Sequence, residues 1–294
     1  MKITTLLGAA ALLGLGFVGD AAASSHSEAP GTSNRAAPSM EPFGTFWLHV
    51  GGGVAMTRNT TFRDQDCNSP NSFFGCDFNA PGDFGDSGAV INLGVGTPLG
   101  GPFRGAIEVF HGNNLQFEGP LVDTSAFSTL NAAGPGITEI FHADAQFTKV
   151  EFWVYVDINK VFELPRYVQP FLGGGVGVTR NRLSNVHSKV ESGSFNLRAD
   201  LPGGTETNFT WGATAGFSIP LDGPNGPVID IFFLHQDLGR VSTRGGDATI
   251  QFNSPFGSSS ETFPVDPVRA DLAVDVFGAR ARFPLNTLFG GSPR

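Results

Sequence analysis

Hydrophobic and polar residues alternate at every second position between residues 147 and 159. One set is Val150, Phe152, Val154, Val156 and Ile158, and the other is Lys149, Glu151, Trp153, Tyr155 and Asp157. Because successive side chains of a β-strand point to opposite faces, a strand here has one apolar face and one face that mixes charges with aromatic rings. A soluble half-buried strand has little reason to expose Trp and Tyr beside charges. We therefore predict a transmembrane strand with its apolar face toward lipid.

The same period-two pattern predicts eight strands in all, at about residues 45–58, 87–97, 103–111, 147–159, 167–180, 208–219, 228–240 and 269–283. The phase of the last segment is ambiguous. Val274 and Val276 oppose Asp275, whereas Phe277 shares the parity of Asp275. We therefore expect a β-bulge near Gly278.

The connections between these segments alternate in length. Residues 98–102, 160–166 and 220–227 are short connections, and the others each span roughly 25 to 35 residues, beyond ordinary hairpin lengths. This alternation predicts an all-β fold, an eight-stranded antiparallel transmembrane β-barrel with short periplasmic turns and long extracellular loops. An even number of strands places both chain ends in the periplasm.

The inward face of such a barrel would carry charges of both signs. An eight-stranded barrel is just wide enough for side chains to fill, so these charges would neutralise one another inside. The predicted interior charges are Arg104, Glu108, Lys149, Glu151, Asp157 and Asp230. Glycines at residues 94–96 and 173–177 lie in strand patterns with no following helix, so we interpret them as space for aromatic rings and not as a phosphate loop.

The first residues predict export. Lys2 precedes an uncharged, largely apolar run at residues 4–18, and an A-x-A cleavage site follows at residues 21–23. Residues 1–23 are thus a predicted signal peptide, with a retained anchor as the alternative. Residues 24–42 are predicted to be a flexible periplasmic lead-in, residues 43–285 the barrel and residues 286–294 a C-terminal tail.

Cys67 and Cys76 lie nine residues apart in a polar stretch. In an oxidising compartment we expect them to form a structural disulfide. A catalytic redox pair would need C-x-x-C spacing, which is absent.

Composition excludes several classes of protein. The net charge is −9 and only 15% of the residues are charged, which argues against a nucleic-acid-binding protein. Hydrophobic residues make up 40% of the chain, which argues against intrinsic disorder.

Three stretches carry a family resemblance: W-L-H-V-G-G-G-V-A at residues 47–55, Y-V-Q-P-F-L-G-G-G-V-G-V at residues 167–178 and V-F-G-A-R-A-R-F at residues 276–283. With them, residues 45–283 resemble the small eight-stranded outer-membrane β-barrels of the OmpA-, OmpX- and opacity-protein type. The resemblance implies location in the outer membrane of a Gram-negative-type cell, contact with outer-membrane lipid and lipopolysaccharide, and delivery by periplasmic chaperones and the barrel-assembly machinery. Such barrels commonly end at an aromatic residue, whereas residues 284–294 follow Phe283 here.

Some barrels of this type are lipid A enzymes, whose deacylase form uses a His and a Ser two residues apart with a Glu. Here His187 and Ser188 are adjacent, and His111 and His142 have no matching Ser. We interpret these histidines as solvated loop residues. No catalytic residue and no enzymatic activity are predicted.

A possible calcium loop begins with Asp64, Asp66 and Asn68. Ser69 and Gly75 stand where the motif requires Gly and Glu, so the motif fails. We predict no bound metal and no cofactor.

Phenylalanines are frequent in the predicted loops, namely Phe62, Phe73, Phe74, Phe78, Phe84, Phe127, Phe141, Phe252, Phe256 and Phe263. Exposed aromatic clusters often mark contact surfaces, and the alternative is that the loops pack on themselves or extend the barrel. We therefore predict a structural or adhesion-type role with an extracellular surface partner. The alternatives are a narrow porin-like channel and a soluble barrel with its apolar face inward.

Overall fold

The computed structural model describes residues 46–58, 60–66, 68–69, 78–79, 87–120, 138–162, 169–192, 195–221 and 226–285. All of them belong to the unit Phe43–Arg294. This part of the chain is almost entirely antiparallel β-sheet, with one short 3-10 helix, η1 (Ile158–Lys160). No helix among these residues is long and apolar enough to cross a membrane.

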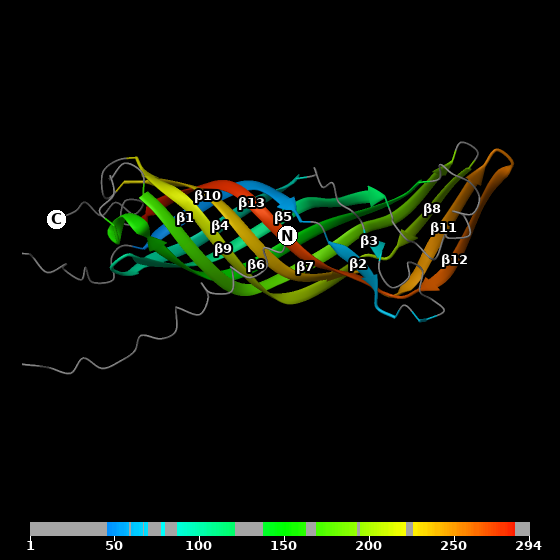
Figure 1. Cartoon of the computed structure of the whole chain (residues 1–294), viewed down its shortest axis with the longest axis horizontal. Coiled ribbons are helices and arrows are strands. Elements are labelled where there is room, and N and C mark those ends of the chain that lie inside the picture. Colours follow the sequence, from blue (N-terminus) through cyan, green and yellow to red (C-terminus); the bar gives the residue numbers. More distant parts are fainter. Residues whose placement is uncertain are drawn as a thin grey trace, which may run out of the picture. The chain divides into compact units, whose positions relative to one another are not determined.

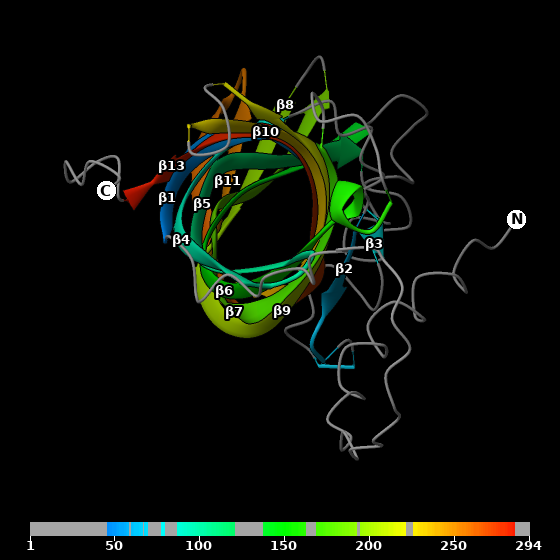
Figure 2. The same cartoon turned by 90° about the vertical axis from the view of Figure 1, so that its left-hand side faces the viewer.

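Eight strands form a closed ring (Figure 2). They are β1 (Trp47–Thr57), β4 (Ser87–Gly100), β5 (Phe103–Pro120), β6 (Thr138–Asp157), β7 (Gln169–Ser192), β9 (Gly204–Pro220), β10 (Val228–Ser242) and β13 (Val268–Pro284). Each strand pairs antiparallel with its two neighbours in the ring, and β13 pairs with β1 to close it. The predicted eight-stranded antiparallel barrel is confirmed.

The two ends of the ring differ. At one end β4 and β5 are joined by a tight turn in which Gly100 and Gly101 have φ angles of 109° and 58°, a region that favours glycine. Trp47 at the start of β1 pairs with Pro284 at the end of β13 at this same end. The opposite end carries the long connections.

The strands extend much further toward that opposite end than the sequence predicts. β5 runs to Pro120, β6 begins at Thr138 and β7 runs to Ser192. The pairing continues through two register shifts, one beside Asn114 and one beside Asn185, and both residues have positive φ.

Three further strands widen this end. β8 (Phe195–Leu201), β11 (Gly246–Ser254) and β12 (Gly257–Val265) continue the sheet from β7 in that order. Figure 1 shows the three strands together at one end. β2 (Thr61–Asp64) pairs with β13, and β3 (Phe78–Asn79) pairs with β2. Much of what was predicted as loop is therefore strand.

The predicted bulge near Gly278 is wrong. Gly278 pairs in unbroken register with Gly53 of β1 and Phe232 of β10. The ambiguous phase has another cause: inward Val274 and Val276 are buried, and outward Phe277 is exposed. The face that carries apolar residues changes along this strand.

Several predictions lie outside the described residues. These are the signal peptide, the lead-in, Cys67 and Cys76, Phe73, Phe74, Phe84 and Phe127, and the tail at residues 286–294.

Candidate functional site

The outward face of the barrel carries an apolar belt. On β6 Val150 and Phe152 are exposed and Val154 and Val156 are half-buried, with half-buried Ile158 following in η1. The exposed belt residues of the other strands include Val50, Val54, Ile91, Leu93, Val95, Ile107, Val109, Leu172, Val176, Val178, Phe209, Phe217, Ile231, Phe233 and Phe277. A continuous apolar surface of this kind has the composition of a face that contacts lipid.

The belt ends abruptly along each strand. On β6 the next outward residues after Val150 are Thr148, Gln146 and Asp144. On β7 the residues after Val178 are Arg180 and Arg182. We call the part of the barrel beyond Thr148, together with β8, β11 and β12, the outer extension.

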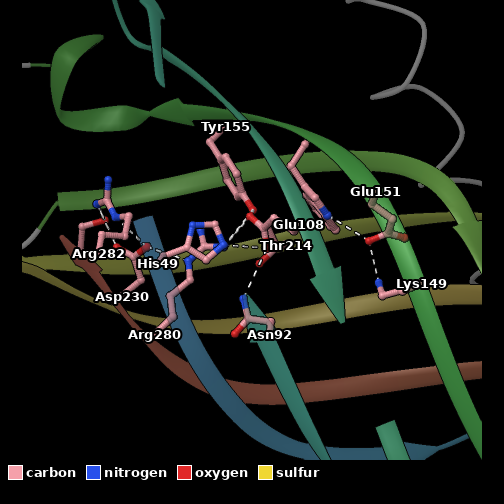
Figure 3. Close-up of polar contacts among 12 residues, drawn as sticks. His49, Asn92, Glu108, Lys149, Glu151, Tyr155, Thr214, Asp230, Arg280 and Arg282 are labelled. Atoms are coloured by element: carbon pink, nitrogen blue, oxygen red, sulfur yellow. Dashed lines mark hydrogen bonds and ion pairs between the residues drawn. The ribbon is translucent and has the colours of Figure 1, made fainter. Parts of the chain in front are cut away.

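Inside the belt, Arg280 links two buried carboxylates (Figure 3). Its Nη1 lies 2.8 Å from Glu108 Oε1, and its Nε lies 2.9 Å from Asp230 Oδ2. The Tyr155 hydroxyl donates to Glu108 and accepts a 3.0 Å bond from Arg280 Nη1. His49 Nε2 lies 3.5 Å from the other oxygen of Glu108.

A second group surrounds Glu151 (Figure 3). Lys149 Nζ donates a 2.6 Å bond to Glu151 Oε2, and Trp153 Nε1 donates a 2.9 Å bond to the same oxygen. Gln236 Nε2 adds a third bond of 3.1 Å. A Cβ at Gly175 would lie 2.4 Å from Trp153, so this glycine makes room for the indole ring.

A third group lies toward the end with the short turns. Arg104 Nε donates to Asp157 Oδ1 at 2.7 Å, and its guanidinium group lies over the Tyr155 and Phe171 rings at 5.1 and 5.4 Å. Arg282 Nε lies 2.9 Å from Asp230.

We call these three groups together the interior ion network, in which four cations face four carboxylates. Its charged members are Arg104, Lys149, Arg280, Arg282, Glu108, Glu151, Asp157 and Asp230. The six predicted interior charges all lie in it. Arg280, Arg282 and His49 were not predicted, although Arg280 and Arg282 alternate with the apolar residues of V-F-G-A-R-A-R-F. Buried charges need such partners, and the paired side chains fill the barrel.

The interior of the outer extension is mainly apolar instead. The Phe62 ring centroid lies 4.8 Å from that of Phe141 and 5.7 Å from that of Phe117, and all three side chains are fully buried. The outer core also contains Leu115, Ala143, Ala145, Phe147, Leu183, Val186, Leu201, Leu238, Val241, Ala248, Val265 and Val268. The hypothesis that Phe62 and Phe141 form an exposed contact surface is therefore wrong. They were assigned to loops, but they fill an extended barrel.

The remaining loop phenylalanines whose side chains are described lie nearer the surface. Phe263 packs partly buried against the outer core. Phe252 is partly exposed, and Phe256 is 100% exposed between β11 and β12.

The histidines considered for catalysis lie in strands of the outer extension or beside it. The His142 and His187 rings are 4.8 Å apart, and His142 Nδ1 lies 3.2 Å from Glu118. His187 is buried in β7 and is not a solvated loop residue. Burial lowers its pKa, the hydrogen bond to the Asn185 carbonyl opposes this shift, and the positive charges of Arg198 and Lys189 add to it. His111 shares a 2.9 Å hydrogen bond with Thr148 on the outward face. Within the described ranges no group of three or more His, Cys, Asp or Glu side chains could hold a metal ion.

No family model and no curated protein matches the sequence. Solved structures with a related arrangement are small outer-membrane β-barrel proteins. Neisserial surface protein A is 12% identical, with a TM-score of 0.40, and the match covers 83% of this chain and 99% of that one. OprG from Pseudomonas aeruginosa is 12% identical, with a TM-score of 0.35 over 82% and 97% of the two chains. The attachment invasion locus protein Ail of Yersinia pestis is 11% identical, with a TM-score of 0.32 over 81% and 99%.

Proposed function

We propose that this chain is a non-enzymatic outer-membrane β-barrel protein with a structural or surface-interaction role exercised by its outer extension. The observation that carries the proposal is the apolar belt around a charged interior. In water the belt would expose a large apolar surface, which is unfavourable in free energy. Contact with lipid removes this unfavourable exposure. The long end of the barrel would then project from the outer surface of the cell.

The filled interior argues against wide permeation. The ion network occupies the barrel at the level of the belt, and the outer core fills it beyond. A barrel filled in this way presents only its outer surface to other molecules.

The hairpin of β11 and β12 offers a surface for a partner. Among the described strands β12 pairs with β11 alone, and its first six residues are exposed. Glu261 is the one charged residue of β12. Edge strands with few charges can pair with an extended segment of another chain. Phe256 adds an exposed aromatic ring at the tip of the hairpin.

Removing the outer part of this hairpin tests the role. Thr249 and Thr262 are paired, so Asn-Gly in place of residues 250–261 would close a short hairpin on them. Cells that display the full chain should attach to a protein-coated surface more strongly than cells that display the shortened chain. Equal attachment, with both barrels shifted in unboiled gels, would contradict the surface-interaction role.

One observation favours a narrow channel as the second candidate. Arg104 Nη1 and Nη2 and His49 Nδ1 are buried without a hydrogen-bond partner within the described part of the chain. Unpaired polar nitrogens of this kind suit bound water. Recordings from planar bilayers separate the candidates: the surface role predicts no stepwise conductance, and reproducible steps would favour the channel.

A further inference from the structure

Three arginines meet on the outer surface just beyond the apolar belt. Arg180 and Arg182 lie on the outward face of β7, and Arg244 follows β10. They line one pocket of about 410 Å³, and the other residues of that pocket are uncharged. All three side chains are exposed.

The arginines have no acidic partner within the part of the chain that the structure describes. Across the described residues no salt bridge joins any of the three to a carboxylate. The residues that pair with Arg180 and Arg182 on the two neighbouring strands are all uncharged: Thr148, Thr207, Gln146 and Thr205. Like charges side by side repel one another, so a bound anion would stabilise the cluster.

The carboxylates near Arg180 and Arg182 along the strands already have partners. Glu206, which pairs with Asn181, accepts a hydrogen bond from Ser242 Oγ. Asp144 pairs with Ser184, one outward position beyond Arg182. It accepts a 2.5 Å hydrogen bond from Asn185 Nδ2, and its other oxygen lies 3.3 Å from His142 Nε2.

The backbone beside Arg244 is held against β13 and β9 without help from the Arg244 side chain. The amide of Thr243 donates to the carbonyl of Val268 at 2.8 Å, and the amide of Val268 donates to Thr243 Oγ1 at 2.8 Å. Gly204 approaches Ser242 so closely that a Cβ would lie 2.1 Å from the Ser242 carbonyl oxygen. The cluster is therefore built into the fold.

The position of the cluster relative to the apolar belt indicates which anion it would bind. Val176 and Val178 precede Arg180 on the same face of β7, and Phe209 is exposed on the neighbouring strand. A strand rises about 3.3 Å per residue, so Arg180 lies only about 7 Å beyond Val178. A group bound there is level with lipid headgroups and not far out in solution.

A second arginine-rich pocket provides a contrast. Its volume is about 590 Å³, and Arg58, Arg63, Arg240 and Arg269 line it together with the carboxylates of Asp64 and Asp271. Arg58 also lies 2.8 Å from Asp275. Acidic residues therefore compensate part of the positive charge of this pocket, whereas no acidic residue lines the first.

We propose that Arg180, Arg182 and Arg244 bind a phosphate group on the headgroup of an outer-leaflet lipid. Guanidinium groups hold phosphate through paired, charge-assisted hydrogen bonds. This site adds a lipid ligand to the proposed function and rests on the outer-membrane placement of the barrel. Only the outer leaflet of that membrane brings a phosphorylated headgroup to the level of these arginines.

The test uses the full barrel folded in a neutral detergent and native mass spectrometry. The probes are bisphosphorylated lipid A, the same lipid without its phosphates, and inorganic phosphate. Wild type should retain the phosphorylated lipid, and the R180Q/R182Q/R244Q variant should bind it about tenfold or more weakly. Arg58→Gln removes an exposed cation that already has an acidic partner, and it should bind like wild type.

Three results would overturn the site: equal binding by the triple variant, equal loss in Arg58→Gln, or equal binding of the dephosphorylated lipid. Inorganic phosphate that displaces the lipid at equal concentration would show a free-anion site and refute the lipid assignment. The mobility shift of each unboiled variant reports barrel closure separately. A folded barrel without lipid selectivity therefore refutes the site alone, whereas an unshifted wild type refutes the outer-membrane proposal.

Discussion

Side chains alternate between the inward and outward faces along the whole of β6, but the face that carries the apolar residues differs between its two halves. From Lys149 to Asp157 the charged side chains point inward and the apolar ones outward. From Phe141 to Phe147 the apolar side chains point inward, and outward lie His142, Asp144 and Gln146. The inward–outward alternation of β6 continues unbroken from Phe141 to Asp157, so the difference reports the surroundings. One half is built for an apolar exterior and the other for water.

This difference also assigns a source of stability to each region. In the belt region, interior stability depends on mutual pairing of buried charges. In the outer extension it depends on apolar burial, as in a soluble protein. Substitutions that remove a buried charge in the belt region or a buried apolar side chain in the outer extension give the clearest tests.

Arg280→Met should have the largest effect. It leaves Glu108 and Asp230 without the cation that joins them, and breaking a buried pair costs about 3–5 kcal/mol. Urea unfolding of the reconstituted barrel measures the loss. Arg240→Met, an exposed cation of the outer extension, is the control, and a loss of equal size there would contradict the comparison.

Leu115→Ala should loosen the outer extension alone. Leu115 is fully buried in the outer core, and such a truncation costs about 2–5 kcal/mol. We expect faster proteolysis of the outer strands with an unchanged gel shift. Gln116→Ala, next to it on the outward face, should leave proteolysis unchanged. Loss of the gel shift in Leu115→Ala would show that the two regions do not differ in this way.

Phe152→Arg should impair insertion, whereas Gln146→Arg on the same face of β6 should not. A charge on the lipid-facing surface at mid-bilayer costs about 2–4 kcal/mol, and Gln146 lies beyond the belt. The folded fraction in unboiled gels measures both variants. Wild-type folding of Phe152→Arg would reverse the assignment of faces.

A pH effect in the outer extension should be the smallest. The pKa of His187 is lowered from 6.5 in the folded protein, so the unfolded chain binds its proton more readily. The stability of the folded state that depends on neutral His187 is fully present above about pH 6.5 and is lost as the pH falls toward the folded-state pKa. Proteolysis of the outer strands should accelerate over this window in wild type and not in His187→Gln. The same acceleration in both would exclude His187 as the cause.

The belt region was predictable because each of its strands shows one apolar face. In β6 and the first residue of η1, for example, five apolar residues from Val150 to Ile158 share one parity. The outer extension was not recognised because its outward residues are those of a loop, as with Gln146, Asp144 and His142. Phe141 and Phe147 carry the missed signal, since they alternate with these polar residues.

The alternation of apolar residues in the last strand, β13, was ambiguous because its apolar face also changes between the belt and the outer extension. Val274 and Val276 lie on the inward face, and so does Arg280, because β13 crosses from the outer core to the ion network. A local bulge was predicted where polarity inverts without any break in register. The partners within the network could not be predicted, because Glu108 and Arg280 are 172 residues apart and meet only when the ring closes.

Spin labels placed one at a time on the outward face of β6 test the central claim most directly. The positions are 142, 144, 146, 148, 150, 152, 154 and 156, in a chain with Cys67 and Cys76 replaced by Ser and reconstituted in lipid vesicles. Collisions with oxygen, which concentrates in lipid, should dominate at positions 150–156, and collisions with a water-soluble nickel chelate should dominate at positions 142–148. Equal access of the nickel chelate to all eight positions would contradict the account.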